Sequence, residues 1–172
     1  MATIVGSRSG LFYKNIPGGL PVIIDARAFS GNVFFVDGSA PAAQRGTTSG
    51  FGTHPDKPLS TIDSAINLCT ANQGDVIFVL PGHTETIADA TTIIPDVAGV
   101  TIIGLGQGSN RPTLTFSAAG GNIPISGANV KMENFLLLGT AAVDVTSAIT
   151  VTGADVKLID IECRESGSTV QF

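Results

Sequence analysis

The sequence predicts an all-β solenoid, and three observations lead to that prediction. Short apolar runs recur along the chain at spacings of 24, 30 and 26 residues, each beginning near a valine: Val76, Val100, Val130 and Val156. Gly-Ala-Asn or Gly-Ala-Asp turns precede the last two runs, because Gly, Asn and Asp tolerate positive φ. After Gly74 no stretch has the 3.6-residue period of an amphipathic helix. A repeat of about 20 to 50 residues with several short strands and no helix is typical of a β-solenoid.

The last two repeats align directly with each other. The ten residues that begin at Ile123 match the ten that begin at Ile149, 26 residues later. Ile, Gly, Ala, Val and Lys recur identically, and Ile/Val, Ser/Thr, Asn/Asp and Met/Leu recur in kind. Since solenoid repeats stack so that equivalent residues lie above one another, we predict that these segments occupy adjacent coils in a stack of about four.

Residues 1–31 differ from the rest of the chain. They are rich in Gly and Pro, with short apolar runs at Leu11–Tyr13 and Val22–Ile24. Pro and Gly at this density break helices and central strands. We predict an extended arm over residues 1–31 that packs on another surface, and the alternative is a frayed terminus. Residues 32–172 then form the solenoid domain.

One strand and one helix are predicted before the repeats begin. Asn32–Val36 has the β-branched and aromatic composition of a strand, and a Gly- and Pro-rich loop follows it. A helix is predicted over about residues 60–72, with Ser60 as its N-cap and Asp63 in the capping-box position. Its apolar stripe has helical spacing and consists of Ile62, Ala65, Ile66 and Cys69. We expect this helix to cover the N-terminal end of the solenoid.

The composition excludes several classes of protein. Only 13% of the 172 residues are charged, against about 25% in average soluble chains, while 43% are hydrophobic. High hydrophobicity with low charge excludes intrinsic disorder. A net charge of −5 lacks the basic footprint of a nucleic-acid binder. A water-soluble chain with so little charge is expected to present surfaces that other proteins cover.

Membrane and secretion signals are not expected either. The longest apolar runs, such as Val76–Leu80 and Phe135–Leu138, are too short to span a bilayer. The N-terminal sequence has no apolar core and no cleavage site of a signal peptide. Cys69 and Cys163 have contexts typical of two separate buried thiols, which suits synthesis in a reducing cytoplasm.

The stretch from Asn32 to Ile87 resembles the first coil of the pectin-lyase-like superfamily of right-handed parallel β-helices. Three motifs carry the resemblance: NVFFVDG from Asn32, DKPLSTIDSAIN from Asp56 and GDVIFVLPGH from Gly74. With the later coils it covers about 140 of the 172 residues. It implies a short, right-handed, single-stranded parallel β-helix of about four coils, with one N-terminal capping helix and an extended N-terminal arm. It implies little about chemistry, because one fold hosts many functions.

The details also resemble small β-helix proteins of tailed-bacteriophage virions, some of which decorate or cement the capsid. That resemblance implies a non-enzymatic structural protein that binds the outer surface of a phage head as an oligomer, with three-fold association. The implied partners are further copies of the chain and the major capsid protein, with neither nucleic acid nor membrane. The implied localisation is the virion, after synthesis in the host cytoplasm.

An enzymatic role needs acidic residues that converge. Glycosidases use paired carboxylates, and superfamily lyases use an acidic cluster for Ca²⁺ together with a base. The best candidates are Asp160, Glu162 and Arg164, which alternate on one outward face of the last predicted strand. The same alternation is the ordinary solvated surface of an outer coil, and we adopt that interpretation. Because Ca²⁺ takes about six oxygen ligands and no such cluster is evident, the sequence predicts no catalytic, cofactor-binding or metal-binding residues.

The remaining motifs also favour structural interpretations. His54 and His83 have no second His or Cys at ligand spacing, so a structural or solvent-facing position is expected for each. The glycines of the Gly104–Pro112 segment are followed by another strand, whereas a dinucleotide-binding turn is followed by a helix. These glycines are therefore interpreted as turn residues.

The C-terminal end of the predicted solenoid has no expected lid, since Thr169–Phe172 still has strand-like composition. Leaving about five apolar side chains in water would forfeit roughly 7–15 kcal/mol, as much as the stability of a whole domain. A symmetric homo-oligomer is the simplest cover for such an end. Two alternatives to capsid decoration stay open: a tail-fibre or tail-spike segment that attaches to host glycans, and a polysaccharide lyase or hydrolase.

Overall fold

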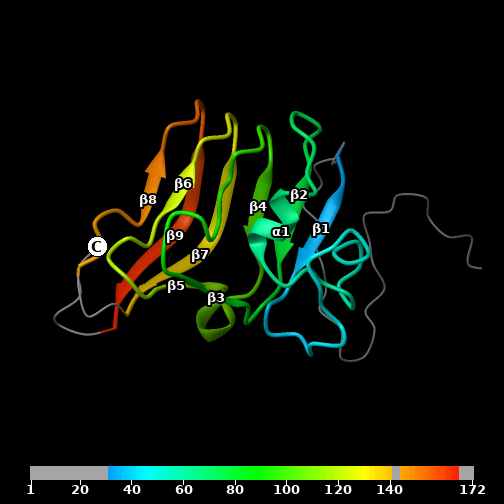
Figure 1. Cartoon of the computed structure of the whole chain (residues 1–172), viewed down its shortest axis with the longest axis horizontal. Helices are drawn as coiled ribbons and strands as arrows, with labels where there is room; N and C mark the ends of the chain where they lie inside the picture. Colours follow the sequence, from blue (N-terminus) through cyan, green and yellow to red (C-terminus); the bar gives the residue numbers. More distant parts are fainter. Residues whose placement is uncertain (1–30, 141–143, 167–172) are drawn as a thin grey trace, which may run out of the picture.

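In the computed structural model the chain forms a β-solenoid of parallel strands with very little helix (Figure 1). The structure describes residues 31–140 and 144–166, so the predicted arm before Gly31 lies outside the described residues. The elements in chain order are β1 (Val33–Val36), α1 (Ile62–Ile66), β2 (Val76–Val79), β3 (Thr84–Ile87), β4 (Thr101–Gly104), the 3₁₀ helix η1 (Gly108–Asn110), β5 (Thr113–Phe116), β6 (Ile123–Ile125), β7 (Lys131–Gly139), β8 (Ile149–Val151) and β9 (Lys157–Glu165).

The strands line three sides of the solenoid, and all of their pairings are parallel. The first side contains β1, β2, β4 and the first parts of β7 and β9. The second side contains β3, β5 and the later parts of β7 and β9, while β6 and β8 form the third. Strands β7 and β9 pass from the first side to the second at Asn134 and Asp160, whose φ angles are 63° and 51°.

The solenoid has about three turns, fewer than the four predicted. The difference lies at the N-terminal end, where β1 is followed by loops and α1 rather than by strands on the second and third sides. The parallel solenoid itself is confirmed. No helix within residues 31–140 and 144–166 is long and apolar enough to cross a membrane.

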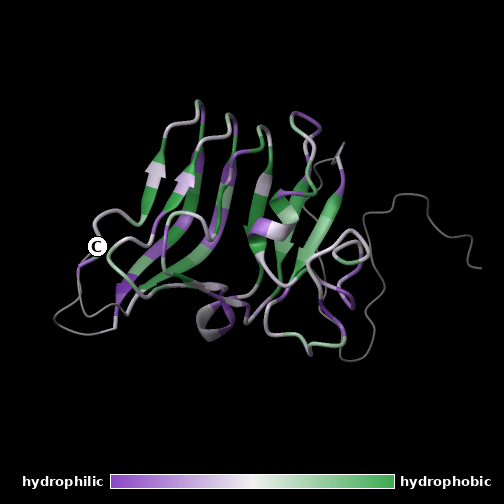
Figure 2. Cartoon of the chain, in the orientation of Figure 1, coloured by the Kyte–Doolittle hydropathy of each residue, from purple (hydrophilic) through white to green (hydrophobic). Residues whose placement is uncertain are grey.

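The interior consists of ladders of apolar side chains that run from coil to coil. On the first side Ile77, Ile102 and Met132 are in register and at most 1% exposed. Phe116 and Phe135 are the largest fully buried side chains. Figure 2 shows that hydrophobic residues concentrate in the strands, whereas the connecting turns are mostly polar or neutral.

The predicted 26-residue repeat is confirmed by the strand register. Ile123 pairs with Ile149, and Lys131 pairs with Lys157. The turn residues before these strands also correspond, since Asn129 and Asp155 have φ angles of 57° and 56°. Asn and Asp are among the few side chains that adopt this conformation readily, and this explains why the turn repeats with them.

The predicted alignment of the earlier repeats is wrong by one residue. Val76 pairs with Thr101, so the residue in register with Val100 is Asp75. The Asp75 carboxylate is fully buried and accepts hydrogen bonds from the backbone amides of Asn32, at 2.6 Å, and Thr70, at 2.7 Å. A position that holds an apolar side chain in the later coils therefore holds an acceptor here, because two corner amides need a partner.

The helix is shorter than predicted and begins one residue later. Thr61, not Ser60, is the N-cap, and its Oγ1 accepts the amide of Ser64 at 3.2 Å. Ser60 instead donates its hydroxyl to the carbonyl of Gly46. The helix ends at Asn67, whose side-chain amide donates to both the carbonyl and the carboxylate of Asp63. The apolar stripe is confirmed, since its three helical members are buried and α1 packs against β1 and β2.

Of the two strands that begin the second side, β5 is the strand expected after Pro112, whereas β3 was not predicted from the sequence. Both alternate Thr with a larger residue, as TETI and TLTF, and they pair with each other in parallel. This two-residue alternation is the sequence pattern that predicts such strands, because the side chains of a strand alternate between its two faces.

Candidate functional site

The three candidate residues of the last coil do not share one face. Asp160 occupies the bend of β9, which interrupts the alternation of side chains along the strand. Glu162 and Arg164 follow the bend and lie on the outward face of the second side, in register with Leu136 and Leu138. The prediction of a continuous outward triplet is therefore wrong, because a residue with positive φ changes the direction of the chain.

Glu162 is held by two arginines. Its carboxylate contacts Arg164 at 2.7 Å and Arg111, from the β4–β5 connection, at 2.8 Å. The hydrogen bond and charge of Arg164, followed by those of Arg111, lower the pKa of Glu162 below its usual value. The carboxylate is exposed and stays ionised, so this cluster ties β9 to the β4–β5 connection electrostatically.

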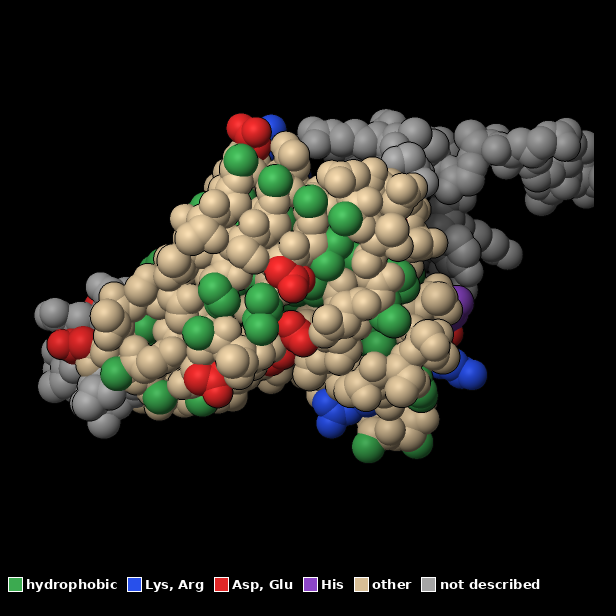
Figure 3. Space-filling view, turned by 45° about the horizontal axis from the view of Figure 1, so that its top comes forward, with side chains coloured by type: hydrophobic (Ala, Val, Ile, Leu, Met, Phe, Trp, Pro, Cys, Tyr) green, Lys and Arg blue, Asp and Glu red, His purple; other side chains and the backbone are tan. Residues whose placement is uncertain are grey.

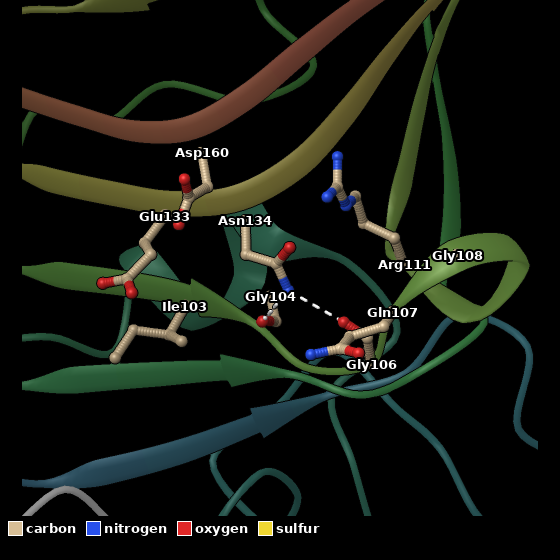
Figure 4. A pocket seen from close by; sticks show the side chains of 9 residues that line it. All are labelled: Ile103, Gly104, Gly106, Gln107, Gly108, Arg111, Glu133, Asn134 and Asp160. Atoms are coloured by element: carbon tan, nitrogen blue, oxygen red, sulfur yellow. Dashed lines mark hydrogen bonds between the residues drawn. The ribbon is translucent and has the colours of Figure 1, made fainter.

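A polar hollow of about 480 Å³ lies next to this cluster, at the corner between the first and second sides (Figure 4). Its lining residues are Ile103, Gly104, Gly106, Gln107, Gly108, Arg111, Glu133, Asn134 and Asp160. The amide nitrogen of Asn134 donates to the carbonyls of Gly104, at 2.7 Å, and Gly106, at 3.0 Å, and thereby fixes the loop that forms one wall. Sequence reasoning selected Asp160 but not its neighbours, which come from three separate coils.

The hollow combines hydrogen-bond donors and acceptors. Glu133 and Asp160 contribute carboxylates, and Glu133 is paired with Lys131 at 2.5 Å. The Nε atom of Arg111 is buried and has no hydrogen-bond partner among the described residues. A buried donor without a partner is costly, and because this atom has almost no accessible surface it is shielded from the hollow rather than presented to it. Alternating donors and acceptors suit a neutral polyhydroxylated molecule better than a bare ion.

His83 has a structural position, as predicted, and participates in a buried hydrogen-bonded chain. The side chain is fully buried, and its Nδ1 accepts the backbone amide of Gly38 at 2.8 Å. The ring therefore donates through Nε2 to Glu85, 3.2 Å away, and Glu85 also accepts the amide of Ile62 at the start of α1. This chain joins the loop after β1, the turn before β3 and the helix. His54, by contrast, lies at the surface.

The cysteines are separate, but only one is shielded. Cys69 donates its thiol to the carbonyl of Ala65, and burial together with the charge of Asp75 raises its pKa to about 12. Cys163 is exposed, contrary to the prediction of two buried thiols, because it lies on β9 at the open edge of the sheet. Across the described part of the chain, no group of three or more His, Cys, Asp or Glu side chains could hold a metal ion.

The coil that contains β8 and β9 leaves the solenoid interior open. The exposed large hydrophobic side chains of the described residues all lie there: Val151 at 47%, Leu158 at 42% and Ile159 at 38%. Leu158 is in register with Met132, and Val151 is in register with Ile125, both of which are buried in the core. Two of these side chains thus have interior positions that no further coil covers within the described residues.

One further face of the molecule carries few charged side chains. Figure 3 shows one face of the molecule, on which a few acidic and basic side chains are spread among neutral ones. The apolar end of the solenoid and the polar corner hollow are therefore the two features with the clearest capacity to bind a partner.

The chain is a β-solenoid protein. Comparisons with known protein families, with curated proteins and with solved structures find no match to it. Its function therefore has to be inferred from the fold and from these two surface features.

Proposed function

We propose that the protein is a non-enzymatic structural protein that works by assembling with other protein surfaces. The observation that carries this proposal is the open coil at β8 and β9. Burying apolar surface contributes about 25 cal/mol per Å², so exposed interior side chains provide a strong driving force for association. The same strand carries the exposed apolar side chains Leu158 and Ile159 among its charged residues, so its edge combines apolar surface with charge.

More specifically, we propose a right-handed parallel β-helix of the pectin-lyase-like superfamily that decorates the head of a tailed phage. In this proposal the chain binds the outer capsid surface as an oligomer, with three-fold association, and the arm before Gly31 contacts the major capsid protein or sister subunits. Support comes from the motif resemblance of Asn32–Ile87, the small number of coils and the low charge.

Electron microscopy of the virions, with gold-labelled antibody against the solenoid, tests the location. Label over the head is expected, and label at the tail or an absence of label from intact particles would contradict capsid decoration. Deletion of residues 2–30 is expected to abolish particle binding while the circular dichroism spectrum of the solenoid is retained. Normal occupancy by the shortened chain would show that the arm is not the attachment segment.

The corner hollow favours a second candidate, attachment of a tail-fibre segment to host glycans. Sugar hydroxyls both donate and accept, so they match the carboxylate of Asp160 and the guanidinium group of Arg111, which line the hollow. Glycan-array binding by the purified chain, lost in Asp160→Ala and Arg111→Ala but kept in the surface variant Asp56→Ala, would favour this candidate. No binding to any glycan by the unmodified chain would contradict it.

A further inference from the structure

We propose that the open end of the solenoid is a two-fold interface, in which β9 pairs in antiparallel register with β9 of a second copy of this chain. The proposal rests on the proposed assembly function and specifies the partner and the geometry of that assembly. Four observations carry it: which strand edges are free, which side chains face inward, how the charges are ordered along β9, and how β9 differs from the preceding coil.

The free strand edge is found at only one end of the described solenoid. β9 pairs with β7, and its other edge has no strand partner within residues 31–140 and 144–166. At the opposite end, the outer edge of β1 is occupied, because the amide of Phe35 donates to Gly52 and the carbonyl of Phe35 accepts the amide of Leu59. A copy that stacks through its own open edge must therefore use β9, and an interface between identical surfaces is two-fold.

The bend of β9 makes such pairing geometrically consistent. A two-fold axis along the bisector of the bend exchanges the part of the strand before Asp160 with the part after it and reverses the strand direction. The inward positions are Val156 and Leu158 before the bend, and Ile161 and Cys163 after it, as their counterparts in the preceding coil are core residues. Residues directly opposite in an antiparallel pair lie on the same face, so inward positions must meet inward positions.

The charges then select one register. When Leu158 lies opposite Ile161 of the partner copy, Val156 lies opposite Cys163, so apolar side chains meet inside. In the same register Lys157 lies opposite Glu162, two opposite charges on the outward face. Moving the partner by two residues, so that Leu158 meets Cys163, would place Lys157 opposite Arg164. Like charges directly opposite each other destabilise a strand pair, so this shift is disfavoured. The opposite shift, in which Val156 meets Ile161, pairs Lys157 with Asp160 but places inward Leu158 opposite Ile159, which is in register with outward Glu133, so the faces exclude it.

The preceding coil lacks this complementarity. Leu136 and Leu138 of β7 are in register with Glu162 and Arg164 of β9, so the two charges appear only on the strand with the free edge. In the favoured register Arg164 lies opposite Asp155 of the second copy, which adds another pair of opposite charges. When β9 pairs with an antiparallel copy of itself, opposite charges therefore meet on the outward face. Apolar side chains meet on the inward face of the same pair.

Disulfide trapping tests the register directly. Opposite Cα atoms in an antiparallel pair are about 4.5–5.5 Å apart, within the range of a disulfide. Val156→Cys is expected to form an intermolecular disulfide with the natural Cys163 and to run as a dimer on a non-reducing gel. Leu158→Cys is the matched control and is expected to remain monomeric on the gel. Cross-linking of the control in preference to Val156→Cys, or of neither variant, would overturn the proposal.

Charge reversal provides a second test that does not depend on the interior. Lys157→Glu and Glu162→Lys each place like charges across the axis twice, and each is expected to weaken association about 10- to 100-fold. Because Glu162→Lys also removes the ion pairs of Glu162 with Arg111 and Arg164 in the same chain, Lys157→Glu is the primary variant. Mixing the two variants restores opposite charges at both positions and is expected to recover association. Lys57→Glu, which changes the same charge at the closed end, is the control.

Light scattering measures the mass of the assembly that the unmodified chain and each variant form in solution. The unmodified chain is expected at an even multiple of its 17.5 kDa mass, either as two chains or, if the three-fold association also exists, as six. A single-chain mass would overturn the two-fold interface. A three-chain mass without cross-linking by Val156→Cys would also overturn it, while the proposed assembly function would stand.

Discussion

Removal of the Asp75 carboxylate is expected to destabilise the solenoid strongly. Asp75→Ala leaves the amides of Asn32 and Thr70 without their acceptor in a fully buried corner. An unsatisfied buried amide costs about 1–3 kcal/mol, so the expected loss is about 2–6 kcal/mol. Because domains of this size are stable by about 5–15 kcal/mol, this loss is a large fraction of the total.

Urea unfolding followed by far-ultraviolet circular dichroism measures this loss, since the chain has no Trp to serve as a fluorescent probe. Asp75→Asn keeps one acceptor oxygen and is expected to lose about half as much free energy of unfolding as Asp75→Ala. Asp89→Ala removes an exposed carboxylate that also accepts a backbone amide, and it serves as the surface control. A loss below about 1 kcal/mol for Asp75→Ala, at an unchanged denaturant slope, would refute the assignment of Asp75 as the partner of these two amides.

Four further predictions concern other parts of the fold. His83→Ala removes the acceptor of a buried amide and is expected to lower the thermal midpoint by several degrees, whereas His54→Ala at the surface leaves it unchanged; equal midpoints would contradict the buried chain. In Lys157→Glu, which is expected to dissociate into single chains, iodoacetamide at pH 8 is expected to modify the exposed Cys163 well before Cys69, whose raised pKa keeps its thiol protonated, and mass spectrometry of peptides reads out the order. The same raised pKa predicts that stability falls as the pH rises from 9 toward 12, because the unfolded thiol ionises first. Gly153→Ala would place a methyl group against the backbone of the preceding coil and is expected to increase hydrogen exchange in β8 selectively, while uniform exchange across the chain would contradict a local effect.

The parts of the structure that follow from local periodicity were predictable. The 26-residue offset of the last two coils is visible as identical residues, and it survives as the register of Ile123 with Ile149. The turn positions were predictable because few side chains adopt positive φ, as Asn129 and Asp155 do. The apolar stripe of α1 was predictable because its residues recur at helical spacing, although the N-cap was predicted one residue too early.

The sequence predictions are wrong where the position of a residue depends on a partner or a bend that the local sequence does not reveal. Asp75 breaks the ladder of valines because it accepts amides that lie 43 and 5 residues away in sequence. Asp160 leaves the outward face because it marks a bend between two sides of the solenoid, which a single strand pattern does not reveal. The corner hollow was not predicted, since its residues come from β4, its following loop, β7 and β9, and only the coiling brings them together.

The sequence by itself determined the class of fold, since a repeated pattern of short strands and tight turns has few ways to bury its apolar residues other than stacking in coils. The tertiary structure alone decided which apolar residues stay exposed. Leu158 and Met132 have equivalent places in the repeat, yet one is 42% and the other 1% exposed, because a further coil covers only Met132. Burial in a solenoid depends on the next coil rather than on the residue, so the same position of the repeat is core in one coil and surface in another.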